Sequence, residues 1–260
     1  MHPHLFGYNA WYAMWAAAAL VGSVVNLFLL RRAGVSLWRA ALLLALTPAA
    51  AFAGARLAFA LESGVPLAQF ASANGFRMPG GLLGAAVAFV VLSWVLRVPV
   101  LLVLDALSPG VALVLSIGRV GCFLNGCCFG VPTALPWGVV FPQDSDPHSS
   151  HRVQGLLGPE STASLPVHPL SLYYALDTLA IMVFLLWLSR RSRYRGEVFL
   201  WFVVLRSWSA VALEQLRGFS VGSGINRSGE VELWIALAGS LTLLFVEWAR
   251  RQRTLQPATA

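Results

Sequence analysis

Charged side chains are scarce in this chain, since Asp, Glu, Lys and Arg together make up only 11% of its 260 residues. Soluble domains typically carry about 25% charged residues, so this composition excludes a soluble globule. Hydrophobic residues make up 58% of the chain, which also excludes a disordered chain, because disorder needs the opposite composition. Lysine is absent altogether, and all 18 basic residues are arginines.

The arginines outnumber the 11 acidic residues and give a formal net charge of +7. In a soluble protein this balance would point to a nucleic-acid partner. In so apolar a chain the arginines must first be placed relative to a bilayer, and we therefore expect a membrane and no nucleic acid as the surroundings of this charge.

Long apolar segments follow one another along the chain, and a transmembrane helix needs about 20 mostly apolar residues. We predict an all-α, polytopic membrane protein with about seven spans, which are Ala10–Leu30, Ala40–Leu61, Gly80–Leu96, Val100–Ile117, Pro169–Leu188, Val198–Leu216 and Val231–Trp248. The N-terminal segment lacks a positively charged start and a clear cleavage site, so we expect the first span to be retained.

The arginines are distributed unevenly between the two sides of these spans. One set of alternate connections holds eleven of them, at positions 31, 32, 39, 97, 190, 191, 193, 195, 250, 251 and 253, and the other set holds five, at 77, 119, 152, 217 and 227. Because cytoplasmic loops carry the excess of basic residues, we expect a periplasmic N-terminus and a cytoplasmic C-terminus. We predict one transmembrane domain over residues 1–250, with a periplasmic or interfacial insertion at about 118–168 between spans four and five, and a cytoplasmic tail at 251–260.

Ionisable residues inside the predicted spans are costly and are functional candidates by default. In the sixth span Arg206, Glu214 and Arg217 fall within about 80° of one another on a helical wheel, so they share one face. Such a stripe at a membrane surface suits an anionic headgroup, because guanidinium binds phosphate through paired hydrogen bonds. A salt-bridged helix end is an equally good interpretation of this segment alone.

The segment SIGRVGCFLNGCCFG, residues 116–130, is the densest in functional residue types. Gly118, Gly121 and Gly126 flank Arg119 and Asn125. Glycines let backbone approach a ligand, and the arginine and asparagine supply donors for phosphate or ester oxygens. Glycine also allows close packing of membrane helices, so the spacing alone does not decide between a site and a packing contact.

Together with other segments, this motif resembles the prolipoprotein diacylglyceryl transferase family of bacterial inner-membrane enzymes. The resemblance rests on GARLAF (54–59), GGLLG (80–84), Asp105 with Pro109, GRVGCFLNGCCFG (118–130), PWGVVFP (136–142), HPLSLYYA (168–175) and ALEQLRG (212–218), which occur in the family's order.

The resemblance implies transfer of a diacylglyceryl group from phosphatidylglycerol to the thiol of a lipobox cysteine in an exported prolipoprotein, with glycerol phosphate as the leaving group. It implies a site that contains catalytic Arg119, Glu214 and Arg217 together with substrate-binding Tyr12, Asn125, Gly130, Arg206 and His168. The expected partners are phosphatidylglycerol or a similar anionic phospholipid and the signal peptide of a prolipoprotein, and we expect no cofactor.

Several positions depart from the family pattern. The family usually has a histidine where this chain has Pro79 and an arginine where it has Ala210. A glutamine and a glutamate of the segment around HPLSLYYA are here Ser171 and Tyr174. Two alternatives therefore stay open, which are a divergent relative with a different acceptor and a non-catalytic protein that binds phospholipid headgroups.

All three cysteines, Cys122, Cys127 and Cys128, lie within seven residues on the side expected to be oxidising. We consider small apolar packing, a Cys122–Cys127 disulfide, a metal site with His151 or His168 as fourth ligand, and a reactive thiol beside Arg119. We favour packing or a disulfide, and expect no metal, because the spacing is not that of a zinc motif. The acids and histidines between Asp144 and His151 are interpreted as a solvated polar loop.

Overall fold

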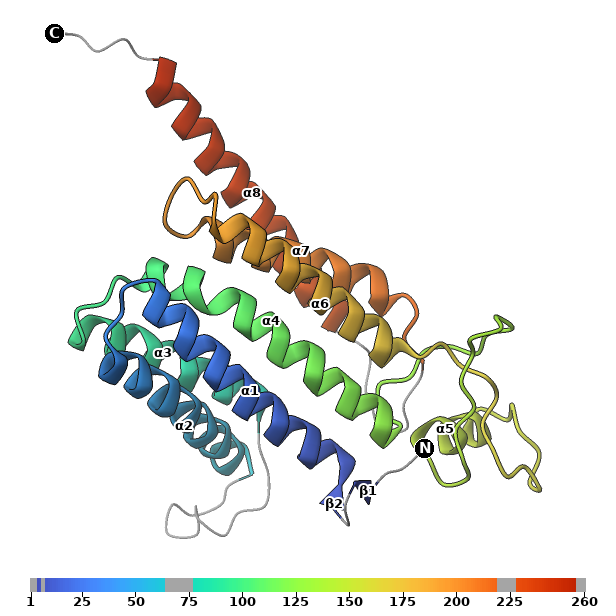
Figure 1. Cartoon of the computed structure of the whole chain (residues 1–260). Helices are drawn as coiled ribbons and strands as arrows, with labels where there is room; N and C mark the ends of the chain where they lie inside the picture. Colours follow the sequence, from blue (N-terminus) through green and yellow to red (C-terminus); the bar gives the residue numbers. More distant parts are fainter. Residues whose placement is uncertain (1–3, 6–7, 64–76, 219–227, 256–260) are drawn as a thin grey trace, which may run out of the picture. The chain divides into compact units, whose positions relative to one another are not determined.

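The computed structural model describes residues 4–5, 8–63, 77–218 and 228–255. In these residues the chain forms eight α-helices and one hairpin of two short strands, β1 (His4–Leu5) and β2 (Tyr8–Asn9). The helices are α1 (Ala10–Arg32), α2 (Leu37–Glu62), α3 (Met78–Val95), α4 (Val100–Asn125), α5 (Asp146–Val153), α6 (Leu170–Ser189), α7 (Glu197–Glu214) and α8 (Ser228–Leu255) (Figure 1). The prediction of an all-α protein is confirmed.

Seven of the helices coincide with the seven apolar segments predicted from the sequence, and α5 lies in the long connection after the fourth. Five of them, α1, α2, α4, α6 and α8, are long and apolar enough to cross a membrane. The helix α3 contains a shorter apolar stretch, Pro79–Val95, and α7 carries Glu197, Arg206 and Glu214. The chain is therefore built as a multi-pass membrane protein.

The fourth helix is longer than predicted. It continues to Asn125 instead of ending at Ile117, so Arg119 lies inside the helix and the long connection begins after residue 125. The prediction failed because Gly118 and Gly121 resemble a helix break. Both instead face α1, where an added Cβ would meet the Trp15 ring at 2.7 Å and the Met14 Cβ at 2.7 Å. These glycines permit close helix packing.

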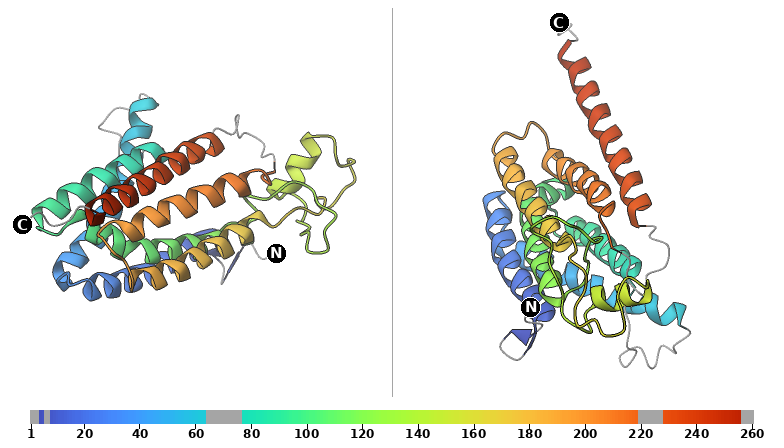
Figure 2. Two further views of the ribbon diagram at one scale, coloured as in Figure 1. Left: turned by 90° about the horizontal axis from the view of Figure 1, so that it is seen from above. Right: turned by 90° about the vertical axis from the view of Figure 1, so that its right-hand side faces the viewer.

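The chain divides into two compact units, of which the first comprises residues 1–22 and 108–260. In this unit α7 packs against both α6 and α8, as the views in Figures 1 and 2 show. A buried apolar cluster that includes Ala112, Ile181, Leu185 and Val198 joins α4, α6 and α7. The connection that contains α5 lies at the end of α4 and the start of α6.

The second unit comprises residues 23–107 and is dominated by the contact between α2 and α3. An added Cβ on Gly84 would lie 2.5 Å from the carbonyl oxygen of Ala50, and one on Gly54 would lie 3.1 Å from the Cα of Gly84. The GARLAF and GGLLG segments therefore bring two helix backbones into contact, which is a common use of small residues in membranes.

The predicted domain boundaries stay predictions. The helix α8 continues to Leu255, across the expected start of a tail at residue 251, and residues 256–260 lie outside the described part of the chain.

Candidate functional site

The central motif turns sharply where α4 ends. Gly126 has a φ of +77°, and its N–H donates to the Phe123 carbonyl at 3.1 Å, while the N–H of Cys127 donates to the Cys122 carbonyl at 3.1 Å. These two bonds form a Schellman motif, in which the residue after the glycine returns to the last full turn of the helix. Glycine is favoured at 126 because other residues adopt this φ at a cost.

Beyond the turn, three distant segments meet at Gly130. Its N–H donates to the His168 carbonyl at 2.9 Å, and it forms an isolated antiparallel bridge with Arg217. The N–H of Gly218 donates to the Phe129 carbonyl at 3.0 Å. An added Cβ on Gly130 would lie 2.6 Å from the His168 Cβ and 2.8 Å from the Leu216 carbonyl oxygen. Glycine at 130 thus holds the central motif against the segments that carry His168 and Arg217.

A buried tyrosine ring on one helix gathers arginines from two others. Tyr174 on α6 is 2% exposed, and the Arg119 Cζ on α4 lies 4.5 Å from its ring centroid. The Cζ of Arg206 on α7 lies 5.2 Å from the same centroid. Cation–π attraction of this kind offsets part of the cost of holding guanidinium groups away from water.

The same tyrosine connects the arginines to a carboxylate. The Tyr174 hydroxyl donates to Glu214 Oε2 at 3.1 Å, and Glu214 Oε1 lies 2.5 Å from the Nε of Arg217. Arg217 lies beyond the end of α7, and its N–H donates to the Glu214 carbonyl at 3.1 Å. This backbone bond keeps the side chains of Glu214 and Arg217 close enough to form their ion pair. The structure thus brings together Arg119, Arg206, Glu214 and Arg217, which the sequence predicted as site residues.

Two other predicted site residues have their contacts outside this cluster. Asn125 is exposed and lines a cavity of about 190 Å³ with Phe141, Asp144, Ser145 and others, and none of the four charged residues lines that cavity. Tyr12 is 68% exposed on α1, and its ring packs edge-on against Trp11 at 5.0 Å. Their roles in the site stay predictions.

His168 contacts the site through its backbone. Its carbonyl accepts from Gly130, while its Nδ1 lies 3.1 Å from the Tyr173 hydroxyl. That hydroxyl also accepts a hydrogen bond from the Trp137 indole at 2.8 Å. The histidine ring therefore belongs to a polar chain with Tyr173 and Trp137 at the N-terminal end of α6.

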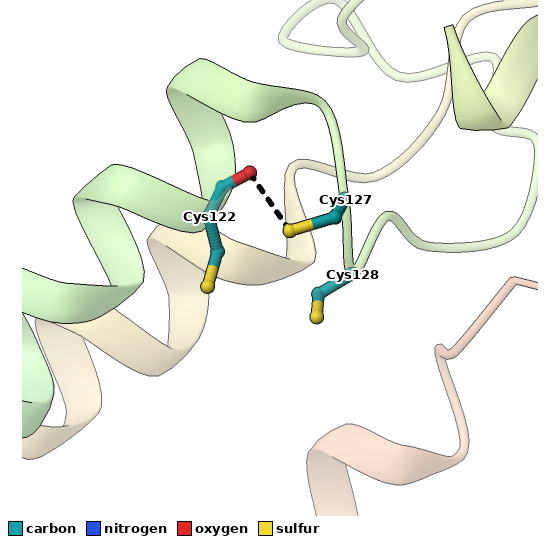
Figure 3. Close-up of side chains that lie close together, drawn as sticks. All are labelled: Cys122, Cys127 and Cys128. Atoms are coloured by element: carbon teal, nitrogen blue, oxygen red, sulfur yellow. Dashed lines mark hydrogen bonds between the residues drawn. The ribbon is translucent and has the colours of Figure 1, made fainter. Parts of the chain in front are cut away.

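The three cysteines converge on one point (Figure 3). Their Sγ atoms all lie within 4.8 Å of one another, and all three are free thiols. The Ser171 hydroxyl donates to the carbonyl oxygens of Cys127 and Cys128 at 3.1 Å each, which fixes the turn against α6. The pKa of the Cys128 thiol is lowered, because the two other thiols donate hydrogen bonds to it and Arg119 and Arg217 contribute positive charge.

Among the residues that the structure describes, no histidine joins the three cysteines as a possible metal ligand. His151 Nδ1 accepts from the Leu165 N–H at 3.2 Å, and its ring packs against Phe129. The Nδ1 of His168 lies 3.1 Å from the Tyr173 hydroxyl. The four-ligand site considered from the sequence is therefore not formed.

The interpretation of residues 144–151 as a solvated loop is wrong. His148 and His151 are each 1% exposed in α5. His148 accepts from the Asp144 N–H at 3.3 Å, and its Nε2 lies 2.9 Å from the Ser161 carbonyl. Ser145 caps the helix, since its hydroxyl accepts from the His148 N–H. The two histidines form hydrogen bonds with other residues of the connection between α4 and α6. The residue types alone do not predict that these histidines are buried.

Acidification is expected to weaken this connection through His151. Burial, followed by repulsion from His148, lowers the pKa of His151 below its ordinary value of 6.5. The unfolded chain therefore takes up a proton first, so stability is constant above about pH 6.5 and declines as the pH falls below it. The measurement is the thermal unfolding temperature in detergent between pH 7.5 and pH 5. A His151→Gln variant serves as the reference, and an equal decline in both proteins would contradict the assignment.

Sequence reasoning missed the central place of Tyr174 and the role of Ser171. Both were noted only as departures from a family pattern, although their i, i+3 spacing places them on one helix face. Tyr174 packs against Leu170 and Ala210 in one buried cluster. The family resemblance implies a glutamate at 174 and an arginine at 210, so this chain has uncharged residues at both positions.

Comparisons with known proteins identify the family to which the chain is similar. The family model described as prolipoprotein diacylglyceryl transferase matches residues 6–247. A phosphatidylglycerol--prolipoprotein diacylglyceryl transferase of Clostridium tetani is 33% identical over 168 residues, which cover 64% of this chain and 62% of that protein. The proteins of that name from Clostridium perfringens and Thermosynechococcus vestitus are 29% and 31% identical, over 65% and 64% of this chain and 61% and 58% of their own lengths. The matched region thus spans about three fifths of these relatives.

Proposed function

The chain belongs to the prolipoprotein diacylglyceryl transferase family, and from this premise we propose that it transfers a diacylglyceryl group from phosphatidylglycerol to the cysteine thiol of a prolipoprotein. The observation that carries the proposal is the cluster of Arg119, Arg206 and Arg217 around Tyr174 and Glu214. Three guanidinium groups, one from α4 and two from α7 and the residues directly after it, form a site for an anionic headgroup.

In the proposed reaction the acceptor sulfur attacks a glyceryl carbon, and the bond from that carbon to the phosphate oxygen breaks. Glycerol phosphate leaves with the electron pair of that bond. Negative charge accumulates on the leaving phosphate, and preorganised arginines stabilise it there. The Nη1 of Arg206 supports this role, because it is buried and has no hydrogen-bond partner among the described residues.

Glu214 acts in this proposal as a positioning residue. It accepts from the Tyr174 hydroxyl and pairs with Arg217, and so holds Tyr174 and Arg217 in place together. The positive field of the arginines favours the thiolate form of the incoming acceptor, which is the nucleophilic form.

The orientation follows from the arginine distribution. We place the chain in the bacterial inner membrane with the N-terminus in the periplasm and the C-terminus in the cytoplasm, because the larger set of arginines marks the cytoplasmic side. On that side Arg193 pairs with buried Glu197 at 2.7 Å and with Glu247 at 2.6 Å, which ties the loop before α7 to α8. The headgroup site then lies near the outer leaflet, at the opposite ends of α4 and α6.

A second candidate function is the same transfer to a different acceptor. Pro79 occupies the position of the family's histidine and offers no proton donor or acceptor in its side chain, and Ala210 removes an arginine. The change at Pro79 concerns the acceptor chemistry, whereas Ala210 packs in the buried cluster that contains Tyr174.

The test replaces the native transferase of a conditional bacterial strain with this chain. Growth and labelling of lipoproteins by radioactive phosphatidylglycerol are expected. Normal expression without either result would exclude the prolipoprotein as acceptor. Release of glycerol phosphate from the purified chain with another thiol would then support the second candidate, and phosphatidylglycerol binding without release would identify a headgroup-binding protein. An Arg152→Ala variant, changed at an exposed arginine of α5, is the control and should complement as the parent chain does.

A further inference from the structure

The cysteine cluster presents three sulfur atoms to one point in space. Cys122 comes from the last full turn of α4, and Cys127 and Cys128 come from the two residues after Gly126 (Figure 3). Each offers one Sγ, and these atoms all lie within 4.8 Å of one another. This spacing is short enough for one ion to contact all three sulfurs after small side-chain rotations.

The backbone holds this arrangement independently of any ligand. The Schellman bond from the Cys127 N–H to the Cys122 carbonyl returns the second cysteine to the first. Cys128 has a φ of +56°, a left-handed conformation that costs a non-glycine residue about 1–2 kcal/mol. The Ser171 hydroxyl holds both cysteine carbonyls, so the surrounding structure compensates that strain. Strain retained in this way is typical of functional positions.

Two arginines lie close to the cysteine cluster. Arg119 and Arg217 both interact electrostatically with Cys128. Three thiolates with a monovalent cation carry a net charge of −2, which two nearby guanidinium groups offset. The closeness of these two arginines is a second observation, beside the convergence of the sulfurs.

The ligand set selects the ion. Thiolates prefer soft cations such as Cu(I) and zinc. Structural zinc almost always takes four protein ligands, and in the described residues no histidine, aspartate or glutamate joins the three cysteines.

We propose that Cys122, Cys127 and Cys128 bind one Cu(I) ion through three thiolates, with release of the three thiol protons to solvent. The site lies beside Arg119, and its occupation does not require the transferase reaction. It departs from the sequence-based expectation of no metal.

The test uses the full chain purified in detergent, reduced and kept free of oxygen. Cu(I) is titrated in competition with a chromophoric Cu(I) chelator. We expect one ion per chain, a thiolate-to-copper absorption band in the ultraviolet, and X-ray absorption that shows three sulfur ligands. Bound Cu(I) should also protect all three cysteines from alkylation by a maleimide, a measurement that needs no variant.

Single variants Cys122→Ser, Cys127→Ser and Cys128→Ser are expected to weaken Cu(I) binding by about 100-fold or more, since even outer-shell changes cost 10-fold to 100-fold. Ser149→Ala, at an exposed position of α5, is the matched control and should bind as the parent chain does. His168→Gln should also leave the affinity unchanged. A loss of affinity in His168→Gln, a nitrogen ligand in the X-ray spectrum, unprotected thiols, or a disulfide that persists under reductant would each overturn the proposal.

Discussion

Replacement of Arg119 by alanine is expected to lower the release of glycerol phosphate from phosphatidylglycerol by about 100-fold to 1,000-fold, the usual loss when one donor to a developing negative charge is removed. Arg119 is the arginine of the central motif, and its guanidinium lies 4.5 Å from the Tyr174 ring centroid, half-buried between α4 and α6. The Arg206 Cζ lies farther from the same centroid, at 5.2 Å. The rate is measured with radioactive phosphatidylglycerol and a lipobox peptide.

Arg119→Lys separates charge from shape. An ammonium group keeps the charge but lacks the planar fork that stacks on a ring and binds phosphate through two bonds, so we expect a large loss here as well. Arg152→Ala is the control for removal of a positive charge in the same unit. If Arg119→Ala keeps more than half of the parent rate, the phosphate is held elsewhere and the assignment of this arginine is wrong.

Replacement of Gly130 by alanine is expected to reduce activity at least about 10-fold and to destabilise the protein by about 1–3 kcal/mol, the usual cost of overpacking. The added Cβ would lie 2.8 Å from the Leu216 carbonyl oxygen and 2.9 Å from that of His168, and neither backbone atom can rotate away. The segments that carry Arg217 and His168 must therefore separate. Activity and the thermal unfolding temperature in detergent are measured together.

Gly158→Ala provides the matched control for this substitution. It adds the same methyl group to the same connection, at a position where no heavy atom lies within 4 Å of the new Cβ. Activity and unfolding temperature should both stay at the parent values. Equal losses in the two variants would mean that alanine acts through the flexibility of the connection, and not through the contacts of Gly130.

The sequence predicted the helices well because hydropathy alone determines where a chain can cross a bilayer. It placed the end of α4 too early, since Gly118 and Gly121 break soluble helices but serve helix packing opposite Trp15 and Met14. That distinction depends on a neighbour that is about 100 residues away along the chain, so no local pattern contains it.

The grouping of Arg206, Glu214 and Arg217 was also predictable, because their spacing places them on one face of a helix. That placement does not depend on which helix packs against this face. Tyr174 was not predictable as its centre, since its importance comes from two arginines on other helices that meet its ring. Asn125 was expected in the same site because the family resemblance implied it. The helix continues through Arg119 and Asn125, and Asn125 lines a cavity that none of the four charged residues lines.

The packing of Tyr174 over Ala210 constrains how this sequence can evolve. A glutamate at 174 alone would place a second carboxylate beside Glu214 and would remove the ring that Arg119 and Arg206 both contact. An arginine at 210 alone would enter a cluster that is already rich in guanidinium groups and would clash with the ring. Because residues 174 and 210 share one buried cluster, we expect substitutions at the two positions to have non-additive effects on stability.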